Sequence, residues 1–135
     1  MWMYFVVFPL LTSVITGGAV SSPSLTSCED GWSDGGSVGL GCLYFYDKSM
    51  TYSAAKQYCN TRHSDLLELE TEDQMEYVGR LISIGGKTWW GGASDEDQEG
   101  EWAWQVSGNP VEQWAWGSRG KPKWNNNKNC FALFI

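Results

Sequence analysis

The sequence is poor in the side chains that an active site most often needs. Its one histidine, His63, has no serine or cysteine motif to pair with. A catalytic nucleophile needs a neighbouring base, and a zinc site needs several nitrogen or sulfur ligands. The glycine pairs at 35–36, 85–86 and 91–92 lack the spacing of a nucleotide-binding loop. We therefore expect a protein that is not an enzyme.

Positive charge is also scarce. Nine Lys and Arg residues stand against 16 Asp and Glu, which gives a net charge of -7. A general nucleic-acid binder needs a basic face that displaces counterions, so we expect no nucleic-acid partner. An apolar fraction of 42% excludes a disordered chain. The sequence therefore indicates one folded, acidic domain.

No apolar run reaches the roughly 20 residues that a membrane-spanning helix needs. The nearest is Met1–Ile15, which contains Pro9 and is followed by small residues up to Ala19. This layout predicts a secretory signal peptide over residues 1–19, although it has no basic start. A membrane anchor is the alternative. We expect a secreted, extracellular chain without stable membrane insertion, and a linker over residues 20–27.

What the sequence has in abundance is tryptophan and glycine, with nine and 16 residues. Two segments nevertheless have helical periodicity. The first begins at Thr51 and places Tyr52, Ala55 and Cys59 on one apolar stripe. The second follows the capping box 71–74, in which Thr71 accepts from the third helical amide while Gln74 reaches back. Its apolar stripe runs to residue 82.

The remaining segments indicate short strands and loops. We predict strands over residues 43–46, 66–69, 89–92, 101–104 and 130–135. Cys28 and Cys42 suit the two arms of a closed hairpin, and 94–100 an acidic turn. The stretch 105–129 is predicted as a long loop that Trp114 and Trp116 anchor. The fold class is therefore α+β.

These pieces stand in an order that resembles a known family. The pieces are Cys28, Gly31-Trp32, Cys42, Thr51–Cys59, Trp89-Trp90-Gly91-Gly92, Glu99–Trp104 and Cys130. Together they resemble the C-type lectin-like domain in its long form, from residue 28 to residue 135. The resemblance implies two helices with small antiparallel sheets and a long loop region, and a Cys28–Cys42 disulfide. It also implies carbohydrate recognition, including the recognition of microbes in innate immunity.

The loop departs from the family at its calcium site. Sugar-binding members have Glu-Pro-Asn or Gln-Pro-Asp where this chain has Lys121-Pro122-Lys123, and an acidic residue where it has Lys128. Calcium needs about six to eight oxygen ligands, and an ammonium group is never one. We therefore expect no calcium at the principal site and no cofactor. Asp95 and Glu99 match an auxiliary calcium site, but we favour a solvated acidic turn there.

The chain also departs from the family in length. Family domains continue past the position of Cys130 with two further cysteines, which normally bond Cys59 and Cys130. We therefore expect a C-terminally incomplete domain over residues 28–135. Cys59 and Cys130 would then stay unpaired, pair with each other or cross-link two chains.

The basic segment, residues 119–128, occupies the place where the family binds sugar. Residues 113–135 contain four cations and no acidic residue. Their charge is therefore +4, and that of residues 1–112 is -11. The candidate binding residues are Arg119, Lys121, Pro122, Lys123, Trp124, Asn125, Asn126 and Lys128. Anionic or sulfated glycans suit them, with Trp124 stacking on a sugar ring. The alternatives are a solvated loop, a protein-interaction module without sugar binding, and a non-functional fragment.

Overall fold

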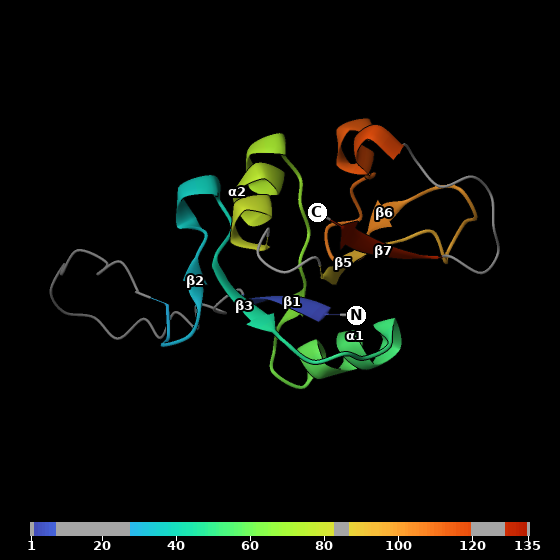
Figure 1. Ribbon diagram of the computed structural model, residues 1–135. Coiled ribbons are helices and arrows are strands. Elements are labelled where there is room, and N and C mark those ends of the chain that lie inside the picture. The colour runs from blue at the N-terminus through green and yellow to red at the C-terminus, as the bar shows by residue number, and fades with distance from the viewer. Residues whose placement is uncertain (1, 8–27, 83–86, 120–128, 135) are drawn as a thin grey trace, which may run out of the picture.

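The computed structural model describes residues 2–7, 28–82, 87–119 and 129–134, and it has the predicted α+β architecture (Figure 1). The strands are β1 (Trp2–Val7), β2 (Ser33–Asp34), β3 (Cys42–Tyr46), β4 (Asp65–Leu66), β5 (Thr88–Ser94), β6 (Ala103–Trp104) and β7 (Cys130–Phe134). The helices are α1 (Tyr52–Asn60) and α2 (Glu72–Ile82), with short 3-10 helices η1 (Gly36–Val38) and η2 (Gln113–Arg119). The sheet order is β2-β3-β1-β5-β6, with β4 paired to β1 and β7 to β5.

The first strand comes from the segment that the sequence predicts as a leader. β1 pairs with β3 and β4 in the antiparallel sense and with β5 in the parallel sense, and it lies between β3 and β5. Its register places Phe5 opposite Tyr44 and Leu66. The other pairings of the described strands are antiparallel, as predicted. The signal peptide itself stays a prediction.

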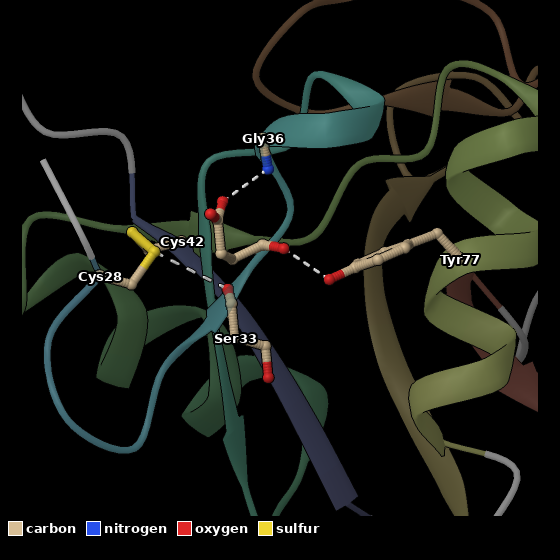
Figure 2. The surroundings of a disulfide bond; sticks show 6 residues. Cys28, Ser33, Gly36, Cys42 and Tyr77 are labelled. Atoms are coloured by element: carbon tan, nitrogen blue, oxygen red, sulfur yellow. Dashed lines mark hydrogen bonds between the residues drawn. A yellow bond between two sulfur atoms is a disulfide. The ribbon is translucent and has the colours of Figure 1, made fainter. Parts of the chain in front are cut away.

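The hairpin predicted at the N-terminal side of the domain is present and covalently closed. Cys28 and Cys42 form a disulfide across a sequence separation of 14. Figure 2 shows how the turn beside it is fixed: the Asp34 carboxylate accepts from Gly36 N at 2.8 Å. Tyr77 of α2 donates its hydroxyl to Asp34 O at 2.5 Å. The disulfide and Tyr77 thus tie the hairpin to itself and to the second helix.

Local capping signals place both helices where the sequence predicts them. Thr51 Oγ1 accepts from Ala54 N at 3.2 Å and begins α1. Thr71 Oγ1 accepts from Gln74 N at 3.2 Å and begins α2. The Gln74 side chain reaches back as expected, but it accepts from Glu70 N at 2.7 Å rather than from Thr71 N. The helix cap therefore includes Glu70, the residue before Thr71, which the capping box does not predict.

Glycines on β5 allow its neighbours to approach closely. A Cβ on Gly92 would lie 2.7 Å from Leu66 O, and a Cβ on Gly91 would lie 2.7 Å from a Phe131 ring carbon. Gly92 N donates to Leu67 O at 2.8 Å. The buried apolar side chains around this contact are Leu40, Leu43, Leu67, Leu69, Val78, Ile82, Trp89, Ala93, Trp102, Trp104, Phe131 and Leu133.

Three sequence predictions on element length were wrong. Within the predicted segment 66–69, only Leu66 belongs to a strand, since Leu67 and Leu69 are buried by packing rather than by continued pairing. Only Ala103–Trp104 is a strand within 101–104. The predicted loop 105–129 contains η2. In each case tertiary packing, not local alternation, decides where regular backbone ends.

Candidate functional site

Two tryptophans fix the start of the basic segment to the core. The Trp116 ring lies 5.0 Å from Trp102 and 5.4 Å from Phe131, centroid to centroid, in edge-to-face geometry. Trp114 also packs against the core from η2. Such aromatic pairs stabilise by about 0.5–1.5 kcal/mol beyond the area that they bury. The prediction that these two tryptophans anchor the loop is confirmed.

The end of the segment is fixed as well. Asn129 precedes β7, whose first residue, Cys130, pairs with Ser94 of β5. Ser94 Oγ donates to Asn129 O at 2.6 Å. Arg119 is the last residue of η2. The other predicted binding residues (Lys121, Pro122, Lys123, Trp124, Asn125, Asn126 and Lys128) lie outside the described residues.

Asp95 is buried, which corrects the prediction of a solvated acidic turn at this residue. Its side chain is 4% exposed, and its Oδ2 accepts from Gly100 N at 3.0 Å. Its Oδ1 and Asn129 Oδ1 are both buried and have no hydrogen-bond partner among the described residues. Asp95 directly follows β5 and Asn129 directly precedes β7, so the pairing of Ser94 with Cys130 places these two residues at the same end of the strand pair.

The auxiliary calcium site can be tested against this geometry. Glu99, its other predicted residue, is half-buried on the same turn. Within the described ranges, no three His, Cys, Asp or Glu side chains gather where they could hold a metal ion. The oxygens of Asp95 and Asn129 are two donors, and calcium needs about six to eight. The described residues therefore do not make a calcium site by themselves.

Cys59 and Cys130 are both free thiols and do not bond each other in the structure. Cys59 is fully buried beside Ala55 and Leu66. Burial is the largest cause that raises the pKa of the Cys59 thiol. Burial, followed by the nearby Glu96 carboxylate, also raises the pKa of the half-buried Cys130 thiol. Both sulfurs are therefore protonated and weakly nucleophilic at neutral pH.

The structure also shows a small pocket that no sequence signal indicated. It has a volume of about 160 Å³ and is lined in part by Asp65, Glu68 and Glu70. The Glu68 carboxylate accepts from Val106 N at 2.6 Å and from Ser107 N at 3.2 Å. These contacts join positions nearly 40 residues apart, so no local sequence signal could reveal them. Glu68 therefore holds the turn after β6 in place.

Comparison with known proteins gives one clear family match. The model of the lectin C-type domain matches residues 48–134. A hepatic lectin of Gallus gallus is 29% identical over 92 residues, which is 66% of this chain and 42% of that protein. A C-type lectin domain family 4 member K of Homo sapiens is 29% identical over 90 residues, 64% of this chain and 27% of that protein. The chain thus spans less than half the length of these relatives.

Solved structures give the same answer for the fold. The carbohydrate-recognition domain of the mouse scavenger receptor C-type lectin superposes with a TM-score of 0.65 at 25% identity, and covers 79% of this chain and 80% of that one. The human counterpart gives 0.62 at 21% identity, with coverages of 80% and 83%. Among the described residues, no helix is both long and apolar enough to cross a bilayer.

Proposed function

Because this chain belongs to the lectin C-type domain family, we propose that it recognises anionic glycans through the basic segment 119–128. The family is one of carbohydrate-recognition domains and is not enzymatic, as the sequence predicts. Binding at an extracellular domain fits a chain that contains a disulfide. The fold then has a binding role at microbial surfaces.

The observation that carries the proposal is the contrast in charge between the segment and the rest of the chain. Residues 113–135 contain four cations and no acidic residue in a chain of net charge -7. The segment leaves η2 and returns at β7, and both of these elements are packed on the core. The arginine and lysine side chains of the segment can form charge-assisted hydrogen bonds with sulfate or carboxylate groups.

We propose that calcium is not needed for this binding. Lys121 and Lys123 would repel a dication, and their ammonium groups cannot coordinate it. Asp95 and Asn129 offer two unpartnered oxygens at the edge of the segment. These buried oxygens can accept from an enclosed water without any metal.

The test is binding to matched sulfated and desulfated glycans, with and without a chelator and over a range of salt. We expect the sulfated glycan to bind, the chelator to have no effect, and added salt to weaken binding. The double substitution Lys121→Gln and Lys123→Gln should weaken binding by about thirtyfold or more, since each charge-assisted contact contributes about 1 kcal/mol or more. Arg80→Gln is the control, because Arg80 is an exposed cation paired with Glu76 on α2.

Two outcomes would overturn the proposal. Binding that is lost with the chelator would restore a calcium-dependent mechanism. Failure on every glycan, together with a stable complex with a protein, would identify a protein-interaction module instead.

We further propose that residues 1–19 act as a signal peptide, that 20–27 form a linker, and that 28–135 form the secreted domain. Expression in a secreting cell should then give a product that begins near Val20, as measured by intact mass. Cleavage at this point removes β1, which lies between β3 and β5. A product that begins at Met1 would contradict the prediction and would leave β1 as a permanent strand.

A further inference from the structure

Two cations, one shortly after β3 and one shortly after α1, have aromatic rings as their neighbours. The Arg62 guanidinium carbon lies 4.2 Å from the centroid of the Tyr58 ring. Lys48 Nζ lies 5.9 Å from the centroid of the Tyr46 ring. Both cations are exposed, and neither has a salt bridge with any described residue. By contrast, Arg80 and Lys87 pair with Glu76 and Asp47.

The two rings connect the cations into one surface. The Tyr46 and Tyr58 centroids are 4.5 Å apart, so that Arg62 and Lys48 flank a single tyrosine pair. Tyr46 belongs to β3 and Tyr58 to α1. In Figure 1, α1 and η2 lie on opposite sides of the central strands. We call Lys48, Tyr46, Tyr58 and Arg62 the tyrosine–arginine surface.

A second pair of rings extends this surface along the hairpin. Tyr44 is two residues from Tyr46 on β3 and therefore points to the same face of the sheet. The Trp32 ring lies 5.1 Å from Tyr44, centroid to centroid. All of these rings are partly exposed. The rings of Trp32, Tyr44, Tyr46 and Tyr58 thus form a row. Lys48 lies beside Tyr46 in this row, and Arg62 lies beside Tyr58.

We propose that the tyrosine–arginine surface is a second binding site, which takes a sulfate or carboxylate group of a short anionic saccharide. Stacking on Tyr58 holds the Arg62 side chain in place, and the guanidinium fork then matches two oxygens of the anion. The neighbouring rings offer apolar edges to the sugar. A short ligand is favoured over a long polyanion, because a chain of net charge -7 repels the latter.

This site is independent of the basic segment, and the experiment separates them. The isotope-labelled full chain is titrated with a sulfated tetrasaccharide and with its desulfated form, and the side-chain signals of Arg62 and Tyr58 are followed by NMR. We expect saturable shifts of both residues with the sulfated form only. Arg62→Gln should weaken binding at this surface roughly tenfold to a hundredfold, which corresponds to one charged hydrogen-bonded contact.

Further variants test the geometry and the specificity. Arg62→Lys keeps the charge but loses the forked guanidinium group. The affinity of this variant should therefore fall between that of the wild type and that of Arg62→Gln. Lys56→Gln removes an exposed cation from the same helix and should leave binding unchanged. The substitutions Lys121→Gln and Lys123→Gln should leave the Arg62 and Tyr58 shifts intact, even if they abolish binding at the basic segment.

Three results would overturn the second site. They are the absence of saturable shifts at Arg62 and Tyr58, equal shifts with the desulfated sugar, and an unchanged affinity in Arg62→Gln. A loss of the Arg62 shifts in the Lys121 and Lys123 variant would instead mean that the two surfaces bind as one.

Discussion

The hairpin region, residues 28–46, and the thiol region, α1 with the start of β7, contain two cysteines each but are held together by different means. Cys28 and Cys42 are covalently joined, and this restricts the unfolded chain. Cys59 and Cys130 are free, and the region around them depends on packing and strand pairing. The same residue type therefore stabilises one region through the unfolded state and the other through the folded state.

The largest effect is expected from removing the disulfide. The double substitution Cys28→Ser and Cys42→Ser opens a loop of 14 residues. We expect the free energy of unfolding to fall by about 2–5 kcal/mol, as measured by urea denaturation. A loss below about 0.5 kcal/mol would mean that the hydrogen bonds around Asp34 already hold the hairpin in the unfolded chain.

A smaller loss is expected from trimming the buried thiol. Cys59→Ala leaves a small cavity beside Ala55 and Leu66 and should cost about 1–2 kcal/mol. Cys130→Ala, at a half-buried position, should cost less than about 0.5 kcal/mol. Equal costs for the two substitutions, measured by urea denaturation, would contradict the difference in packing.

Alkaline pH should destabilise the thiol region more than the hairpin region. Burial raises the pKa of Cys59, so its thiol stays protonated in the folded chain above about pH 8.5, where an unfolded thiol ionises. The unfolded state then binds fewer protons, and stability falls as pH rises, by at most about 1.4 kcal/mol per pH unit. Burial also raises the pKa of Tyr52 to about 12, which adds a loss in the same direction from about pH 10.

The measurement is the urea midpoint between pH 8 and pH 10, with Cys59→Ala as the control. We expect the wild-type midpoint to fall more steeply with pH than that of the variant. Parallel slopes would show that the buried thiol is not the group responsible.

A small effect is expected where the hairpin region meets α2. Tyr77→Phe removes the hydroxyl that donates to Asp34 O and leaves the ring in place. The contact is exposed, so we expect a loss of about 0.5–1 kcal/mol. Differential scanning calorimetry of this variant, with and without the disulfide, should give additive losses if the two ties act independently.

Predictions from sequence succeeded where a signal is local and failed where it is not. Thr51 and Thr71 begin the two helices because a hydroxyl can cap a nearby amide in any fold. Asp95, by contrast, is buried directly after the point where Ser94 pairs with Cys130, a residue far away in sequence. The length of β4 likewise depends on where its partner strand lies.

The two proposed binding surfaces show the same contrast between local and non-local sequence signals. The basic segment was found from composition alone, because four cations lie close together in sequence. The tyrosine–arginine surface was not found, because Lys48 and Arg62 come from different elements and only Tyr46 and Tyr58 bring them together. Clusters that form only in three dimensions leave no such mark on a sequence.

The contact of Trp116 with Trp102 has a practical consequence. Two indoles with centroids 5.0 Å apart and nearly perpendicular planes couple their electronic transitions. Near-ultraviolet circular dichroism should therefore contain a signal from this pair that is present only while η2 is seated on the core. Because the basic segment begins at the end of η2, a change in this signal on adding a ligand would report that binding to the segment moves η2.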